Sequence, residues 1–219
     1  MRICIIGSSG GSVAKELIEA SNGNHKFSII TDRECGLESV ALESGIDCSR
    51  IEEPDNSVFS QKAKHKLDNQ GGVDIILLFF MRLVTKELFH TYKTLNFHPS
   101  LLPEYRGFNA IERAYRNRVN EFGATLHLVD EKADNGPIIA NVSTPLLPWF
   151  DLNRMHKISF AQKVYLALHL IDRLELHGNT DWIPAEENQT FHANPSLTSE
   201  RIRDFYLKFI KREKIFAAT

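Results

Sequence analysis

Short apolar runs bounded by polar residues, glycine or proline recur through the first half of the chain. They fall at Arg2–Ile6, Phe27–Thr31, Asp74–Phe79 and Thr94–His98, with a weaker one at Asp47–Ile51. Runs of this length that lack regular alternation are typical of strands buried on both faces of a parallel sheet. We therefore predict a parallel sheet at the centre of the molecule.

Segments with helical periodicity separate these runs, as an α/β fold requires. The predicted helices are Ser12–Ala20, Gly36–Ser44, Ser57–Leu67 and Asn109–Arg116. Further on, Gly123–Val129 alternates as a strand, and Pro137–Thr144 returns beside it. A return of this kind is antiparallel, so we expect a mostly parallel central sheet with an antiparallel return, flanked by helices.

The C-terminal part of the chain is predicted to be helical. A long helix begins at Asp151 or Asn153 and runs to about His177, where Gly178 can cap it. A second helix carries an apolar stripe at helical spacing, formed by Ile202, Phe205, Tyr206, Phe209 and Ile210. We predict a main domain over residues 1–190 and a C-terminal helical extension over residues 191–219. The stripe would pack either on the body or on a second subunit, which would make a homodimer.

Composition narrows the functional classes. Of 219 residues, 42% are hydrophobic and 25% charged, as in ordinary globular proteins, and the net charge of -2 favours neither nucleic-acid nor membrane binding. The three cysteines, Cys4, Cys35 and Cys48, are isolated, so we expect no disulfide framework and no metal site. The apolar start is too short for a signal peptide, and no run is long enough to span a bilayer. We expect a cytoplasmic protein with small-molecule partners.

Polar side chains gather where the predicted strand Thr94–His98 ends. Asn96 and His98 are two residues apart and therefore point to one face, and Pro99 stops the strand. Open α/β sheets bind ligands at this carboxyl end, where an amide beside an imidazole can stabilise an oxyanion. Asp134, in a later polar loop, could orient the imidazole. Taken singly, Asn96 and His98 are explained at least as well as hydrogen-bonded residues at a strand end, and Asp134 as a turn residue.

A linked set of motifs changes that balance. Asn96–Pro103 reads Asn-x-His-Pro-Ser-Leu-Leu-Pro, Arg106-Gly107 follows, and Gly123–Val129 and Asp134–Pro137 complete the set. Together with Phe80–Leu83, which reads Phe-Met-Arg-Leu, these pieces resemble the folate-dependent formyltransferases, in the same order. Within that family the likeness is greatest to the phosphoribosylglycinamide formyltransferases. The resemblance extends over roughly residues 2–178 and implies a Rossmann-like formyltransferase fold.

The resemblance implies an N-formyltransferase that uses 10-formyltetrahydrofolate as formyl donor. The acceptor amine would attack the formyl carbon directly, with Asn96 and protonated His98 holding the oxyanion. Asp134 would support the imidazolium and help relay the proton from the amine to the departing folate nitrogen. Residues implied to bind the cofactor are Phe80, Met81, Arg82, Leu83, Val84, Val129, Asp130, Glu131 and Ala133. Residues implied to bind the acceptor are Gly10, Gly11, Ser12, Pro99 and Gln162. His127 is either a second imidazole of the site or a hydrogen-bonded residue at its rim.

The glycine-rich turn Gly7–Ser12 would form either an anion cradle at a helix start or a tight strand-to-helix connection that binds no ligand. It lacks the Gly-x-Gly-x-x-Gly spacing of dinucleotide sites, which disfavours nicotinamide binding even though Asp32 stands where a ribose-binding acid would. Enzymes that formylate glycinamide ribonucleotide carry Ser-Asn at this helix start, whereas this chain has Ser12-Val13. The positions that contact the substrate from the long helix correspond to Ser159 and Gln162, which are uncharged.

These departures favour another small amine, such as an amino sugar or a sugar nucleotide, as the acceptor. A true phosphoribosylglycinamide formyltransferase of purine biosynthesis is one alternative. A second is a formyltetrahydrofolate deformylase, although such enzymes usually carry an additional N-terminal regulatory domain that we do not expect here. A third is a nonenzymatic module that binds folate or a nucleotide.

Overall fold

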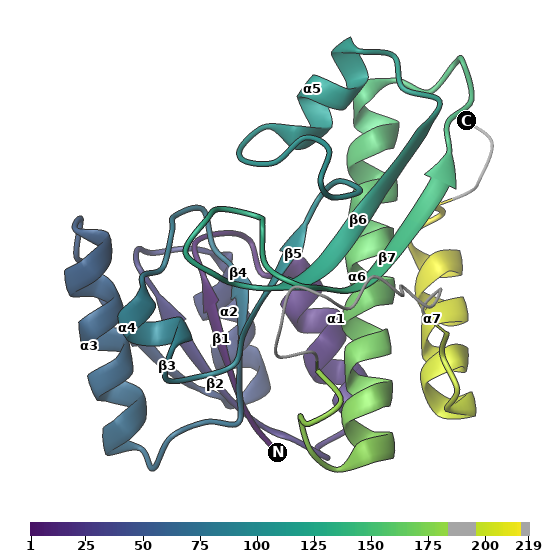
Figure 1. The fold of residues 1–219 in the computed structure, drawn as a ribbon. Helices are drawn as coiled ribbons and strands as arrows, with labels where there is room; N and C mark the ends of the chain where they lie inside the picture. The colour runs from purple at the N-terminus through teal and green to yellow at the C-terminus, as the bar shows by residue number, and fades with distance from the viewer. Residues whose placement is uncertain (184–195, 216–219) are drawn as a thin grey trace.

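The computed structural model describes residues 1–183 and 196–215. Within these residues one seven-stranded sheet has the order β3-β2-β1-β4-β5-β6-β7 (Figure 1). The strands are β1 (Arg2–Gly7), β2 (Lys26–Thr31), β3 (Asp47–Arg50), β4 (Ile75–Phe79), β5 (Thr94–His98), β6 (Glu121–Leu128) and β7 (Ile138–Pro145). The pairs from β3 to β5 are parallel, whereas β6 runs antiparallel to β5 and to β7. The predicted mostly parallel sheet with an antiparallel return is therefore confirmed.

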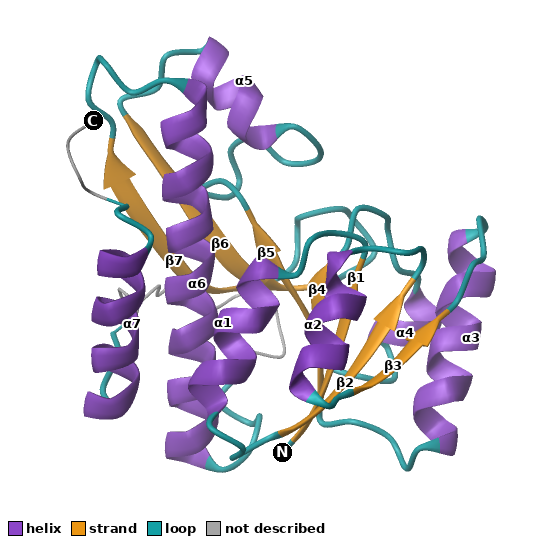
Figure 2. Cartoon of the chain, turned by 180° about the vertical axis from the view of Figure 1, so that it is seen from behind, coloured by secondary structure: helices purple, strands orange, loops and turns teal. Residues whose placement is uncertain are grey.

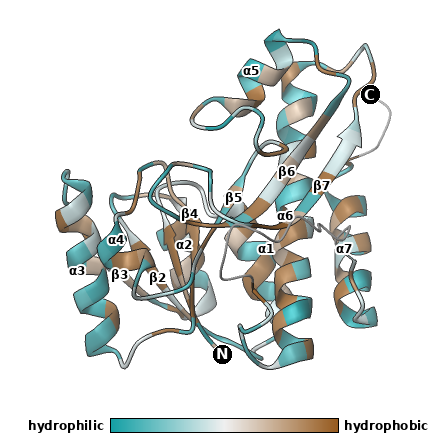
Figure 3. Cartoon of the chain, in the orientation of Figure 1, coloured by the Kyte–Doolittle hydropathy of each residue, from teal (hydrophilic) through white to brown (hydrophobic). Residues whose placement is uncertain are grey.

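Helices cover both faces of the parallel half of the sheet (Figure 2). They are α1 (Ser12–Ser21), α2 (Gly36–Ser44), α3 (Asn56–Asn69), α4 (Lys86–Phe89), α5 (Ala110–Arg116), α6 (Leu152–His177) and α7 (Glu200–Arg212). Alternate side chains of one strand enter different cores: Ile3 and Ile5 pack towards α1, α2 and α6, while Cys4 and Ile6 pack towards α3 and α4. Such two-sided burial explains why the strands read as continuous apolar runs, and the central strands are correspondingly brown in Figure 3.

The predicted helices and strands occur in the predicted order, with boundaries that differ by one or two residues. The short helix α4 was not predicted, because a single turn of four residues is too short to show apolar periodicity. The long helix α6 begins after Asp151, whose carboxylate accepts a hydrogen bond from the Arg154 N–H at 2.7 Å, and it ends at Gly178 in the left-handed conformation. None of the helices in the described ranges is long and apolar enough to cross a membrane.

The C-terminal helix α7 packs on the body of its own chain. Ile202 and Phe209 are fully or almost fully buried, and the Phe209 ring meets Phe160 of α6 edge to face with centroids 5.4 Å apart. Asp172 of α6 accepts hydrogen bonds from the Thr198 and Ser199 N–H groups, both at 2.8 Å, and so holds the start of α7. The first of the two expected roles is therefore observed. A homodimer through this helix stays a prediction, and the proposed domain boundary after residue 190 lies outside the described residues.

Candidate active site

A cavity of about 300 Å³ opens beyond the carboxyl ends of β4 and β5. This is next to the point where the strand order reverses, between β1 and β4, which is where open α/β sheets bind ligands. Four segments line the cavity: residues 80–84 after β4, the end of β5 with Pro99, residues 107–110 before α5, and residues 129–134 after β6. The site therefore consists of loops that leave strand ends, as the sequence predicted.

His98 lies at the end of β5, 4% exposed, with hydrogen-bond acceptors at both ring nitrogens. Its Nδ1 is 3.2 Å from Asp134 Oδ2, and its Nε2 is 3.0 Å from the carbonyl oxygen of Tyr105. A carboxylate and a carbonyl can only accept, so a hydrogen on either ring nitrogen finds a partner here. These two acceptors fix the orientation of the His98 ring that the predicted mechanism needs.

Asp134 is the hub of the polar groups in the cavity. Its Oδ2 also accepts the Gly107 N–H at 2.8 Å, and its Oδ1 is 3.5 Å from Nε2 of His127. Burial alone would raise the pKa of Asp134, but hydrogen bonds from His127 and His98, the charge on His98 and the Gly107 N–H hold the pKa well below its ordinary value. Asp134 therefore stays an anion beside His98.

The backbone of the Asp134 loop explains its turn-like sequence. Asp134 has φ +51°, a left-handed conformation that aspartate tolerates better than most residues. At Gly136 an added Cβ would lie 2.1 Å from the Leu128 carbonyl oxygen, so only glycine lets the loop return this closely to β6. The Asp-Asn-Gly turn and the predicted catalytic role are therefore compatible, because the turn brings the carboxylate back to β5.

Asn96 and His127 face each other across the antiparallel pair of β5 and β6. The Asn96 amide Nδ2 lies 3.2 Å from His127 Nε2 and donates to Asp134 Oδ1 at 3.3 Å. His127 Nδ1 donates to its neighbour's carbonyl, that of Leu128, at 2.7 Å, and its Nε2 faces both the Asn96 amide and the carboxylate of Asp134. His127 was expected to be either a second imidazole of the site or a hydrogen-bonded residue at its rim. The ring is hydrogen-bonded and 2% exposed, and it also lines the cavity.

Two of the four walls contain every residue predicted for the cofactor. Phe80, Met81, Arg82, Leu83 and Val84 line one side, and Val129, Asp130, Glu131 and Ala133 line another. Met81 and Leu83 are 62% and 52% exposed, so apolar side chains stand at the mouth of the cavity, where an aromatic ring could cover them. Sequence reasoning missed the wall at residues 107–110, including the exposed Phe108; the Arg106-Gly107 motif was the only sign of it.

The residues predicted for the acceptor are not gathered in the same way. Pro99 lines the cavity, but Gly10, Gly11 and Ser12 do not; they form the tight turn into α1. Gly11 has φ +75°, and a Cβ there would lie 2.9 Å from the Leu37 backbone, so this turn packs closely on α2. Val13 is buried in the core.

Gln162, which was predicted to bind the acceptor, lies apart from this cavity. Its side chain is 3% exposed, and its amide donates to the Phe122 carbonyl at 2.9 Å and to Thr144 Oγ1 at 3.0 Å. This face of α6 is turned onto β6 and β7, so Gln162 lies in the core beneath the sheet and does not line the cavity. Ser159, one turn earlier, is also buried.

The comparisons with known proteins agree with this geometry. The family model described as formyl transferase matches residues 1–166, and the chain belongs to that family. It is a one-carbon transferase, and the formyl donor of this type of enzyme is 10-formyltetrahydrofolate.

Among its relatives, the phosphoribosylglycinamide formyltransferase of Mycobacterium tuberculosis (strain CDC 1551 / Oshkosh) is 27% identical over 192 residues, 82% of this chain and 87% of that protein. The enzyme of the same name from Escherichia coli (strain K12) is 24% identical, with 85% and 95% covered. The solved structure of phosphoribosylglycinamide formyltransferase from Bacillus halodurans superposes with a TM-score of 0.77 at 26% identity, over 84% of this chain and all of that one. The Rossmann-like formyltransferase fold is therefore confirmed.

Proposed function

We propose that this chain transfers the formyl group of 10-formyltetrahydrofolate directly to the primary amine of a small acceptor, and that the acceptor is glycinamide ribonucleotide. The observation that carries the chemistry is the contact of His98 with Asp134 beside the Asn96 amide, at the base of the cavity between residues 80–84 and 129–134. The names of the relatives support the acceptor, since they are phosphoribosylglycinamide formyltransferases.

The reaction forms one carbon–nitrogen bond and breaks another. The amine nitrogen bonds to the formyl carbon while the carbonyl electrons move to oxygen, and the Asn96 amide and the His98 imidazolium donate to the oxyanion. For this, the formyl oxygen takes the place of the Tyr105 carbonyl at Nε2 of His98 and the place of His127 Nε2 at the Asn96 amide. When the oxyanion collapses, the bond to the folate nitrogen breaks, and that nitrogen takes up the proton that the amine gives up.

The expected contributions to the rate agree with these roles of the residues. A single oxyanion donor contributes about 10²–10³-fold to the rate, and general acid–base help adds about 10²–10⁴-fold. Asp134, held as an anion, keeps the His98 ring oriented and helps to relay the proton from the amine to the departing folate nitrogen. No covalent enzyme intermediate is needed.

A second acceptor is kept because two observations favour it. Val13 occupies the helix-start position of an asparagine and is buried in the core, and Gln162 is turned into the core. Both departures remove polar contacts on the acceptor side, which leaves an amino sugar or a sugar nucleotide as the alternative small amine. Backbone N–H groups at the start of α1 would remain to bind a phosphate in either case.

Measurement of tetrahydrofolate release separates these functions. The purified protein is supplied with 10-formyltetrahydrofolate and with glycinamide ribonucleotide, with amino sugar nucleotides, or with no amine. We expect amine-dependent release, with kcat/KM for glycinamide ribonucleotide in the range of about 10⁴–10⁸ M⁻¹s⁻¹ usual for cognate substrates. Preference for an amino sugar would select the second acceptor, and equal release without amine would indicate hydrolysis and contradict the proposal.

A further inference from the structure

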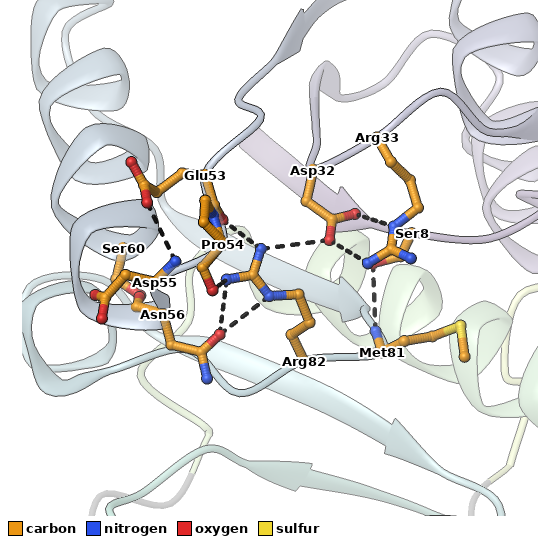
Figure 4. Close-up of polar contacts among 10 residues, drawn as sticks. All are labelled: Ser8, Asp32, Arg33, Glu53, Pro54, Asp55, Asn56, Ser60, Met81 and Arg82. Atoms are coloured by element: carbon orange, nitrogen blue, oxygen red, sulfur yellow. Dashed lines mark hydrogen bonds and ion pairs between the residues drawn. The ribbon is translucent and has the colours of Figure 1, made fainter.

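Arg82, between β4 and α4, directs its side chain into a cage formed by two other parts of the chain, residues 53–56 and Asp32 (Figure 4). Its guanidinium donates to the carbonyls of Glu53 and Pro54, both at 2.7 Å, and to Oδ1 of Asn56 at 2.8 and 3.0 Å. It also lies 3.5 Å from the carboxylate of Asp32. The Arg82 side chain is only 16% exposed. Although residues 80–84 line the cavity, the N–H donors of this side chain bind other residues of the protein.

Aromatic rings complete the cage. The guanidinium carbon lies 5.3 Å from the centroid of the Phe59 ring and 5.8 Å from that of Phe80, within the range of cation–π attraction. The two rings are stacked on each other with centroids 5.0 Å apart. Phe80 lines the cavity and Phe59 belongs to α3, so the arginine joins the cavity wall to a helix that does not line it.

The backbone on either side of Arg82 is held by hydroxyl groups. The Met81 N–H donates to Ser8 Oγ at 3.4 Å, and the Thr85 N–H donates to Ser60 Oγ at 3.0 Å. Between these two points, the N–H groups of residues 82–84 donate to no other described residue. The stretch is thus fixed at both ends and by the side chain in its middle, while its own backbone groups remain available at the cavity.

Asp32 closes the arrangement into a ring of contacts. It is 7% exposed, bonded to Arg33 at 2.7 Å, and close to Arg82. Burial alone would raise the pKa of Asp32, but hydrogen bonds from Arg33 and Ser8 and the charge on Arg33 lower it. Ser8, which accepts from Met81, therefore connects back to the acid that faces Arg82.

We propose that Arg82 is a positioning residue for the cofactor: anchored on residues 53–56 and Asp32, its side chain holds the backbone of residues 82–84 at the cavity, where the N–H groups of this backbone would bind reduced folate. The inference rests on the folate-dependent function proposed above and goes beyond it. According to this inference, the loop before α3 controls the affinity for the formyl donor although it lies outside the cavity. The chemical step, which depends on Asn96, His98 and Asp134, is left unchanged, and so is acceptor affinity.

Asn56 gives the sharpest test, because it receives two of the bonds from Arg82 and does not line the cavity. Asn56→Leu keeps the size of the side chain but removes the acceptor, whereas Asn56→Asp keeps an acceptor oxygen. We expect Asn56→Leu to raise the Kd of tetrahydrofolate, measured by calorimetry, and the donor KM by about tenfold. We expect kcat and the acceptor KM to change less than about twofold, and Asn56→Asp to bind folate like the wild type.

Arg50→Met is the matched control. Like Arg82, Arg50 is an arginine whose guanidinium donates hydrogen bonds to its own chain, here to the carboxylates of Glu38 and Glu52. Arg50 does not line the cavity, so its loss should leave folate affinity unchanged. Melting temperatures of the free proteins show whether a variant is merely unstable. If Asn56→Leu does not fold, Arg82→Lys replaces it, since lysine keeps the charge but cannot fill the fork of acceptors.

Unchanged folate affinity in both Asn56→Leu and Arg82→Lys would overturn the inference while leaving the proposed function intact. The same holds if donor and acceptor KM rise together, which would indicate general loosening of the structure. A wild-type protein that binds no reduced folate would overturn the proposed function, and this inference with it.

Discussion

The donor side and the acceptor side of the cavity differ in how directly the sequence specifies them. Each residue predicted for the donor side lies on a loop that leaves a strand end, and all of them line one cavity. Of the residues predicted for the acceptor side, Pro99 lines it, whereas Gln162 is buried on the opposite face of the sheet. Strand order alone brings strand ends together, but the position of a helical side chain also depends on how the helix is rotated about its axis.

The largest expected effect tests the residues that the two sides share. His98→Ala, Asn96→Ala and Asp134→Ala should each lower kcat by at least about 10²-fold, because each removes a donor to the oxyanion or the support of one. Steady-state release of tetrahydrofolate measures this, with tetrahydrofolate binding as the control for folding. Full activity in a folded variant would remove that residue from the mechanism.

A smaller effect is expected at His127, which touches Asn96 and Asp134 from β6. His127→Ala removes one of the two hydrogen-bond partners of the Asn96 amide, a contact worth about 1–1.5 kcal/mol that helps to orient the amide. The variant should therefore lower kcat about tenfold. The donor KM should stay within about twofold. A fall as large as that of His98→Ala would instead place His127 among the catalytic residues.

Gln162→Leu tests whether the comparison between the two sides holds. The variant loses hydrogen bonds to the Phe122 carbonyl and Thr144, so unfolding in urea should show a loss of about 1 kcal/mol. The acceptor KM should not change, because the side chain does not reach the cavity. A severalfold rise in acceptor KM with unaltered donor KM would restore Gln162 as an acceptor-binding residue.

The smallest effect concerns acid stability. The pKa of Asp134 is lower in the folded protein than the value of about 3.9 expected when unfolded. Its contribution to stability is therefore present above about pH 4 and is lost as the pH falls towards the folded-state pKa. The free energy of unfolding of the wild type should exceed that of Asp134→Asn at pH 7, by on the order of 1 kcal/mol. The gap should narrow by about pH 3, and a gap that does not change with pH would contradict this.

Much of the fold followed from the sequence because its strands are buried on both sides. Apolar runs such as Asp74–Phe79 left little choice of state, and Gly45 and Gly178 ended helices where predicted. The contact of His98 with Asp134 was also predicted, since both residues belong to motifs at strand ends. The contact of His98 Nε2 with the Tyr105 carbonyl was not predicted, because every residue has a main-chain carbonyl and the sequence does not indicate where it points.

The contacts of Arg82 were also not predictable from the sequence. The motif indicated a cofactor segment, and the residue does line the cavity. That its guanidinium turns towards Glu53, Pro54 and Asn56 depends on how the loop before α3 folds over β4, which no local pattern reports. Contacts between segments that are distant in sequence and lack periodicity have to be observed.

The seat of α7 has a consequence for biosynthesis. Arg212 binds Glu16 of α1 at 2.5 Å across 196 positions of sequence, and Arg201 donates to the Ala20 carbonyl. During synthesis α1 leaves the ribosome well before α7, so the edge of α1 that α7 covers stays exposed until α7 has been translated. Contacts between such distant segments form slowly, and apolar surface exposed in the meantime promotes aggregation. Docking of α7 should therefore be a late step in folding of the described residues.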